Sequence, residues 1–263
     1  MAEEFDCLSL IRKKSKRRAG TAILIFPGLI PTYEDLDKEI EMFAKFGDVF
    51  AFHYPEDKFD IFKFYERITT TIKQLYYKRV VLVGVSFGGT LAYLLLRYWR
   101  KRRLNMGVKC LVALSSPFEP ENLTPISQFQ LDFGSTVDQY ARRVFIWMVR
   151  IMRWIWRWPV QWMTIYARDN TFRQTLNALW MAGDVLQRDW LVKKRLLEPP
   201  ALLLNVRDDV RDKFIRQTNE LDFKDIFPRG KILRVMKDHA DIGGMSPAAY
   251  RQVEEFIRLA LDR

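Results

Sequence analysis

The sequence is poor in the side chains that bind metal ions or form disulfides. Among its 263 residues are only 2 cysteines and 2 histidines. Cys7 and Cys110 are far apart along the chain and neither lies in a cluster with metal-ligand spacing, so we interpret both as reduced thiols that are not ligands. A zinc site needs about four cysteine, histidine or carboxylate ligands close together, and we therefore expect no metal and no cofactor.

Long uncharged hydrophobic runs are also missing. No stretch has the roughly 20 consecutive apolar residues that cross a bilayer. Acidic side chains and then a basic run over 12–18 begin the sequence, without an apolar segment of the signal-peptide type. We therefore expect a cytoplasmic protein. The sequence also has no helix-turn-helix, zinc-finger, RRM or KH pattern, so nucleic-acid binding is not indicated.

Basic side chains, in contrast, are in excess, and the formal net charge is +11. Such a balance attracts polyanions, including nucleic acids, anionic lipid surfaces and acidic substrates. The simpler interpretation is a well-solvated surface, which we prefer to any specific partner. A hydrophobic content of 49% is ample for the core of one large α/β domain or two small ones.

Apolar runs typical of buried strands alternate with helical patterns along most of the chain. This alternation predicts the α/β class, with a mainly parallel sheet and helices on both faces. The expected strands are 7–12, 21–26, 48–53, 79–83, 108–114, 201–206 and 231–236. The expected helices are 33–46, 59–77, 87–103, 212–227 and 247–261.

The alternation stops in the middle of the chain. Residues 120–198 have long helical patterns and no clear strand, and the alternation resumes after Pro199-Pro200. We interpret 120–198 as a helical cap inserted into a core made of 1–119 and 199–263. This division predicts a single α/β domain with a cap over one end of its sheet.

The stretch Gly84-Val85-Ser86-Phe87-Gly88 is the most informative motif in the sequence. It follows an apolar, β-branched run and precedes a helical pattern. A Gly-x-Ser-x-Gly turn between a strand and a helix is the nucleophile elbow, in which the serine has a strained backbone and its hydroxyl projects above the sheet. The turn is so tight that the residues two places before and after the serine must lack bulk. We therefore predict that Ser86 is a nucleophile.

A serine hydroxyl needs a base, and the base needs an orienting carboxylate. In parallel α/β sheets such groups lie in loops beyond the carboxyl ends of the strands. His239 follows the last expected strand, and Asp208 and Asp209 follow the strand before it. His53 comes before the elbow, and we interpret it as a structural residue or one near the mouth of the pocket.

The order Ser86, Asp208 or Asp209, His239 resembles that of the α/β-hydrolases with a helical cap, and the resemblance covers nearly the whole chain. In that family the acid usually lies in a Gly-x-x-Asp turn. Asn205-Val206-Arg207-Asp208 fits this turn, with asparagine in place of glycine, so we prefer Asp208 to Asp209. The resemblance implies an α/β-hydrolase fold and an acyl-enzyme mechanism.

The resemblance also implies an oxyanion hole made of two backbone N–H groups. The turn Phe26-Pro27-Gly28-Leu29 matches the family's first donor loop, with Pro27-Gly28 in place of the familiar His-Gly. The replacement changes a side chain and removes no donor at Leu29. The Leu29 N–H would be one donor and the Phe87 N–H, directly after the nucleophile, the other.

The expected cap contains a segment rich in tryptophan, methionine and arginine, 142–158. At 100° per residue its arginines fall in one arc and its apolar side chains fill a wide remainder, in which Met148 and Met152 would line a pocket for substrate. Arginines beside tryptophans also suit the surface of an anionic membrane. A cap helix with a solvated arginine face is the interpretation that we rank slightly higher.

Taken together, these residues predict a serine hydrolase that cleaves small-molecule carboxylic esters or thioesters with an apolar acyl or alkyl part. An acyltransferase, a peptidase or a C–C bond hydrolase would use the same residues. Serine at the elbow argues against epoxide and haloalkane chemistry, which in this fold uses aspartate there. A non-catalytic scaffold that kept the fold is the alternative from another class. Acyl chain length, leaving group, acyl acceptor and oligomeric state are not encoded in any motif that we recognise.

Overall fold

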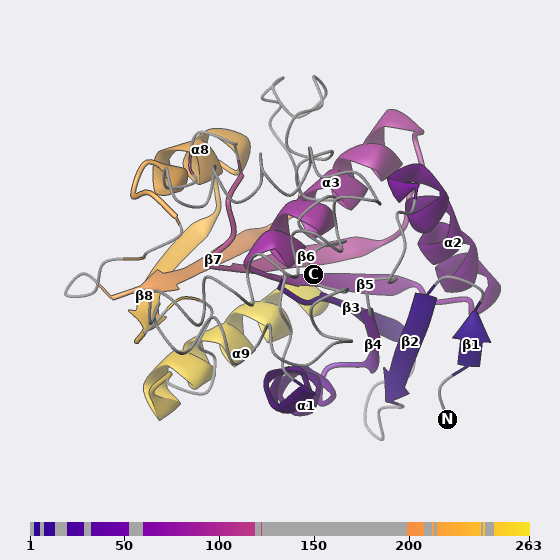
Figure 1. Ribbon diagram of the computed structural model, residues 1–263, viewed down its shortest axis with the longest axis horizontal. Helices are drawn as coiled ribbons and strands as arrows, with labels where there is room; N and C mark the ends of the chain where they lie inside the picture. Colours follow the sequence, from indigo (N-terminus) through magenta and orange to yellow (C-terminus); the bar gives the residue numbers. More distant parts are fainter. Residues whose placement is uncertain are drawn as a thin grey trace, which may run out of the picture.

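The computed structural model describes the following residues of the chain: 3–5, 8–13, 20–28, 33–52, 60–118, 122, 199–207, 212, 215–237, 239 and 245–263. Within them an eight-stranded sheet lies between helices (Figure 1). The six strands from β4 to β8 in the sheet run parallel, and β1 and β2 add an antiparallel edge. The order of strands across the sheet is β1-β2-β4-β3-β5-β6-β7-β8.

The strands follow the apolar runs of the sequence closely. Their bounds are β1 Glu3–Phe5, β2 Leu8–Lys13, β3 Thr21–Phe26, β4 Asp48–Phe52, β5 Arg79–Val85, β6 Val108–Leu114, β7 Ala201–Val206 and β8 Lys231–Met236. The central strands β3, β5 and β6 are almost wholly buried. Strands covered on both faces read as continuous apolar runs, which explains why they are easily found in the sequence.

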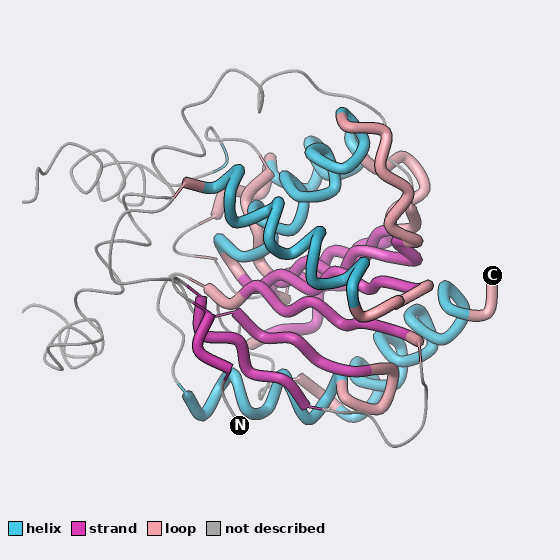
Figure 2. Tube along the Cα trace, turned by 90° about the vertical axis from the view of Figure 1, so that its right-hand side faces the viewer, coloured by secondary structure: helices cyan, strands magenta, loops and turns pink. Residues whose placement is uncertain are grey.

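Helices cover both faces of the sheet (Figure 2). Their bounds are α1 Tyr33–Phe43, α2 Ile61–Gln74, α3 Phe87–Lys101, α8 Asn219–Ile226 and α9 Pro247–Leu261. α2, α3 and α8 pack on one face and α1 and α9 on the other. Alternate residues of a strand point to opposite faces, so Leu24 of β3 belongs to the first apolar cluster and Ile25 to the second.

Local signals set the starts of two helices. The Asp60 side chain accepts hydrogen bonds from the N–H groups of Phe62 and Lys63 and caps α2. The Ser246 side chain accepts one from Ala249 and caps α9, with Pro247 in the first turn, where its missing N–H costs nothing. These caps leave the apolar faces of both helices directed at the sheet.

The predicted α/β class with a mainly parallel sheet is confirmed. The prediction of a helix over 212–227 is wrong at its start, because α8 begins at Asn219 and Asp212 precedes it. The short strand β1 was not predicted. Apart from Asn122, the expected cap over 120–198 lies outside the described residues, so the division into core and cap stays a prediction. None of the described helices is long and apolar enough to cross a membrane.

Candidate active site

Ser86 occupies a sharp turn between β5 and α3. Its φ of 51° and ψ of −123° lie in a region that residues with a side chain rarely adopt, at a cost of about 1–3 kcal/mol. The turn is held by the Ser86 N–H, which donates to the Leu114 carbonyl at 2.6 Å, and by the Gly89 N–H, which donates to the Ser86 carbonyl at 3.0 Å. The neighbouring strand β6 thus helps to hold the strained serine in place.

Three glycines make room for this turn. A Cβ on Gly84 would lie 2.2 Å from the Gly89 Cα, and one on Gly88 would lie 1.9 Å from the Phe26 carbonyl oxygen. Both contacts are with backbone, which explains physically why the motif needs glycine two places before and after the serine. Gly89, which the motif does not specify, is equally constrained, because its Cβ would lie 1.9 Å from the Ser116 Oγ.

His239 lies beside the serine. Its Nε2 is 2.8 Å from the Ser86 Oγ, across 153 positions of sequence. The histidine follows β8 and the serine follows β5, so both stand at the carboxyl end of the parallel sheet. This distance is within the hydrogen-bond reach that a general base requires. The sequence-based pairing of Ser86 with His239 is thus a contact in the structure.

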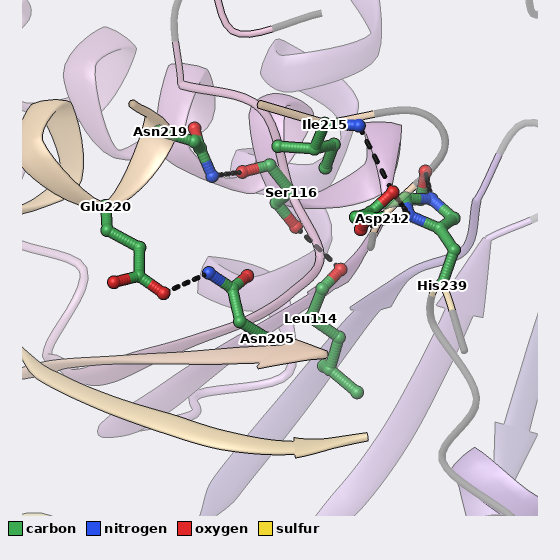
Figure 3. A network of polar contacts seen from close by, with 9 residues as sticks. Leu114, Ser116, Asn205, Asp212, Ile215, Asn219, Glu220 and His239 are labelled. Atoms are coloured by element: carbon green, nitrogen blue, oxygen red, sulfur yellow. Dashed lines mark hydrogen bonds and ion pairs between the residues drawn. The ribbon is translucent and has the colours of Figure 1, made fainter. Parts of the chain in front are cut away.

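The other ring nitrogen of His239 faces Asp212 (Figure 3). The Nδ1 atom is 2.9 Å from Oδ2 and 3.1 Å from Oδ1 of this carboxylate. The side chains of His239 and Asp212 are 13% and 10% exposed, so the pair is shielded from water. The Ile215 N–H also donates to Oδ1 at 3.1 Å and holds the carboxylate in this orientation.

Asp212 takes the place that the sequence analysis expected for Asp208. Asp208 and Asp209 lie outside the described residues, and the carboxylate that contacts His239 is that of Asp212. The sequence analysis predicts a helix over 212–227, whereas α8 begins at Asn219 and leaves Asp212 outside the helix. The stretch Arg207-Asp208-Asp209-Val210-Arg211-Asp212 contains three carboxylates, and the expected roles of Asp208 and Asp209 stay predictions.

The expected oxyanion hole is described in part. Phe87 begins α3 directly after the serine, where helix N–H groups have no partner within the helix. Gly28 passes beside the serine, since a Cβ there would lie 3.5 Å from the Ser86 Cβ. Leu29 is the next residue along but lies outside the described residues, as do His53, Met148 and Met152. Their expected roles therefore stay predictions.

Other chemistry-bearing side chains of the described region have ordinary surroundings. Cys110 on β6 is fully buried, and burial raises the pKa of its thiol to about 12, which makes it a poor nucleophile. Ser115 and Ser116 follow β6 and are both buried, and the Ser115 Oγ has no hydrogen-bond partner in the described region. Histidine, cysteine and carboxylate side chains do not gather there in a group of three or more that could hold a metal ion.

Known structures with a similar backbone include several hydrolases. An alpha/beta hydrolase enzyme from a Medee basin deep-sea metagenome library matches with a TM-score of 0.60 and 13% identity over 97% of this chain and 93% of that one. The type II thioesterase BorB from the borrelidin biosynthetic cluster matches with a TM-score of 0.63 and 13% identity over 94% and 97%. A variant of an epoxide hydrolase from Bacillus megaterium matches with a TM-score of 0.61 and 13% identity over 100% of both chains.

Comparison of the sequence alone is uninformative. No family model and no curated protein sequence matches the chain. The structural matches span nearly the whole chain, and at such low identity they establish the fold. The chain has the α/β-hydrolase fold, with Ser86 at the elbow and with His239 and Asp212 in the loops after β8 and β7.

Proposed function

From the α/β-hydrolase fold and its elbow serine, we propose that the protein is a serine hydrolase of carboxylic esters or thioesters with an apolar acyl or alkyl part. The observation that carries the proposal is the pair of contacts made by His239. Its Nε2 lies 2.8 Å from the Ser86 Oγ, and its Nδ1 lies 2.9 Å from the Asp212 Oδ2. Nucleophile, base and orienting acid in this geometry are the requirement for acyl transfer through serine.

In the proposed mechanism, the Ser86 Oγ attacks the substrate carbonyl while His239 Nε2 accepts its proton. Asp212 holds Nδ1–H and stabilises the imidazolium. The N–H groups of Leu29 and Phe87 bind the oxyanion, and the tetrahedral intermediate expels the leaving alcohol or thiol, which takes the proton from His239. Water then attacks the acyl-enzyme with His239 as base and releases the acid and free Ser86.

The choice of esters and thioesters rests on the nucleophile and on structural similarity. Serine forms an acyl intermediate, whereas epoxide chemistry in this fold uses aspartate at the elbow. A type II thioesterase is among the proteins of similar fold, which favours including thioesters. Acyltransferases, peptidases and C–C bond hydrolases use the same residues, so the nature of the acceptor and leaving group is a matter for substrate profiling.

Two measurements test the proposal. A fluorophosphonate probe should label the wild-type protein at Ser86 and leave Ser86→Ala unlabelled, because the probe needs an activated serine. p-Nitrophenyl and CoA esters of increasing acyl length should then be hydrolysed with a preference for longer chains, since each buried CH₂ adds about 0.8 kcal/mol. A folded wild-type protein that neither reacts with the probe nor hydrolyses any ester would support the non-catalytic scaffold.

We further propose that the cap contributes to substrate and membrane contact. Met148 and Met152 would line the acyl pocket, and their replacement by polar residues should slow hydrolysis of long-chain esters more than of acetate esters. Replacement of Arg150, Arg153 and Arg157 by glutamine should weaken binding to anionic vesicles, and this binding should fade with salt. Failure of the wild type to sediment with anionic vesicles at low salt would contradict the membrane contact.

A further inference from the structure

The segment that leaves β6 lies in direct contact with the elbow. The Leu114 carbonyl accepts the Ser86 N–H at 2.6 Å, and the Ser116 hydroxyl donates to the same carbonyl at 3.1 Å. The Thr90 hydroxyl of α3 donates to the Pro117 carbonyl at 2.6 Å. Residues 114–118 are therefore hydrogen-bonded both to the elbow and to the helix that follows it.

Asn219, the first residue of α8, binds this segment from the other side (Figure 3). Its side chain is fully buried. The Nδ2 atom donates to the Ser116 carbonyl at 2.8 Å, and Oδ1 accepts the Phe118 N–H at 3.0 Å. The two bonds use the amide as a donor and as an acceptor at once, and they join parts of the chain that are more than 100 positions apart.

Two of the described residues between Asp212 and Asn219 bind Asn122, which follows β6 in the chain. The Arg216 N–H donates to the Asn122 carbonyl at 2.6 Å, and the Thr218 hydroxyl donates to Asn122 Oδ1 at 3.1 Å. The Ile215 N–H, three residues before Thr218, holds the Asp212 carboxylate. The described residues that follow the acid are thus bonded to the strand exit through Asn219 and to Asn122 through Arg216 and Thr218.

The side chains of Thr218 and Asn219 do not act as ordinary caps of α8. Thr218 is the N-cap residue of α8, yet its side chain makes no capping bond and is directed to Asn122 instead. An asparagine at a helix start normally stays near water, whereas Asn219 is buried and has both its polar atoms satisfied across the loops. The polar groups at this helix start therefore connect two loops.

We propose that Asn219 is a positioning residue for the active site. It sets the Asp212 carboxylate, and through it His239, at the correct distance from Ser86 by joining the β7–α8 loop to the exit of β6. This inference rests on the proposed function. A displacement of about 1 Å at a catalytic group can cost roughly 100-fold in rate, so loss of the amide should slow the reaction of Ser86 strongly.

The test is the second-order rate of Ser86 labelling by a fluorophosphonate. Asn219→Ala should label roughly 10- to 100-fold more slowly than the wild type. The matched control is Thr69→Val, since Thr69 is also buried and bonded across two helices, accepting from Trp99 Nε1 at 2.7 Å and donating to the Tyr65 carbonyl at 2.6 Å. It should lower thermal stability while leaving the labelling rate unchanged.

Thr218→Val is a milder change at an exposed residue and should slow labelling by a smaller factor. It provides the test if Asn219→Ala does not fold.

A double mutant separates positioning from general destabilisation. If Asn219 acts through Asp212, then Asn219→Ala should have little further effect once Asp212→Asn is present, because coupled residues are not additive. Equal slowing in both backgrounds, or wild-type labelling by Asn219→Ala or by Thr218→Val, would overturn the inference. Failure of the proposed function is a different result, in which Asp212→Asn itself labels like the wild type.

A second readout does not depend on reaction with the probe. The Nδ1–H of His239, bonded to Asp212, should give a low-field proton resonance, and the chain has only one other histidine to assign. The resonance should persist in Thr69→Val, disappear in Asp212→Asn, and broaden or shift in Asn219→Ala. An unchanged resonance in folded Asn219→Ala would contradict the positioning role even if labelling slowed.

Discussion

Residues with a side chain and a positive φ occur at both ends of the parallel sheet, for different reasons. At the amino-terminal end, Tyr76 and Arg103 each have a φ of 56°. Both are exposed, and each follows the C-cap residue of its helix, α2 or α3. At the carboxyl end, Ser86 and Ser115 have φ values of 51° and 40°, and both follow strands. A positive φ thus belongs to a helix ending at one end of the sheet and to the active-site edge at the other.

The hydrogen bonds show where each conformation comes from. After α2, the Tyr77 N–H donates to the Ile72 carbonyl at 3.3 Å, and after α3 the Leu104 N–H donates to the Trp99 carbonyl at 2.8 Å. Both are the local bonds of a Schellman ending. Ser86 is held by the Leu114 carbonyl of a neighbouring strand, at 2.6 Å. The positive φ values at the amino-terminal end of the sheet follow from the local ending of a helix. At the carboxyl end, tertiary packing imposes the conformation of Ser86.

The largest expected effect is that of Ser86→Ala. Turnover should fall by up to ~10⁶-fold, and His239→Ala should be about as damaging, because the residues act as a unit. Alanine keeps the strained backbone, so its unfolding free energy should stay close to that of the wild type. Ser86→Gly should be equally inactive and more stable by about 1 kcal/mol, since glycine relieves the strain. Hydrolysis within tenfold of wild type by Ser86→Ala would remove the serine mechanism.

Asp212→Asn should have the next largest effect on activity. An amide cannot hold the required tautomer of His239, and the loss should be about 10⁴-fold in kcat. Asp208→Asn and Asp209→Asn serve as controls, and each should stay within tenfold of wild type. This order replaces the sequence-based expectation that Asp208 is the acid. A larger loss in Asp208→Asn than in Asp212→Asn would restore it.

Alanine substitutions of one glycine at each end of the parallel sheet should show how tightly each end is packed. Gly88→Ala should destabilise the protein by about 3 kcal/mol or more, because its Cβ would lie 1.9 Å from a backbone oxygen that cannot move freely. Gly20 precedes β3 at the amino-terminal end, where a Cβ meets nothing within 4 Å and only its φ of 82° is unfavourable. Gly20→Ala should cost about 1–2 kcal/mol. Urea unfolding of both variants measures the difference, and equal losses would contradict it.

Acid should loosen the start of α8. Glu220 accepts hydrogen bonds from Arg234 Nη2 at 2.5 Å and Asn205 Nδ2 at 2.8 Å. The bond from Arg234 is the main reason that the pKa of this carboxyl lies below its ordinary value of 4.5. Because the folded pKa is the lower one, the contribution is complete above pH 4.5 and is lost as the pH falls through the folded value.

The Glu220 contribution is measured by unfolding at several pH values. Glu220→Gln should reduce the loss of stability between about pH 5 and pH 3 by about 1 kcal/mol or less, because the ion pair is partly exposed. Glu255→Gln, which replaces an exposed carboxylate on α9, is the control and should leave the acid response unchanged. An identical acid response in Glu220→Gln and the wild type would contradict the assignment.

The smallest expected effects are those at the helix endings. Tyr76→Gly and Arg103→Gly should each stabilise the protein by roughly 0.5–1 kcal/mol, because glycine adopts a φ of 56° without strain. The rate of ester hydrolysis should be unchanged, since both residues lie at the opposite end of the sheet from Ser86. Thermal unfolding and steady-state kinetics check both points. A loss of activity in either folded variant would show that the two ends are coupled.

Local patterns were sufficient for the strands and the elbow. Buried parallel strands are recognisable in the sequence as continuous apolar runs. The tight turn around Ser86 excludes any Cβ at Gly84 and Gly88, so it is recognisable as a Gly-x-Ser-x-Gly motif. The histidine after β8 was found for a similar reason, since chain order and strand ends limit the candidates. These features can be recognised from short stretches of sequence, although the limit on Gly88 comes from the Phe26 carbonyl of a neighbouring strand.

The choice of acid depends on contacts between distant residues. Asp208, Asp209 and Asp212 are the same residue type and lie within five positions of one another in the sequence, and no stereochemical rule within that stretch distinguishes them. Asp212 contacts His239 because the following residues are bonded to Asn122 and Ser116, about 100 positions earlier. The orienting acid needs only the correct distance and direction to His239, and the folded structure determines both through contacts between segments that are far apart in the sequence.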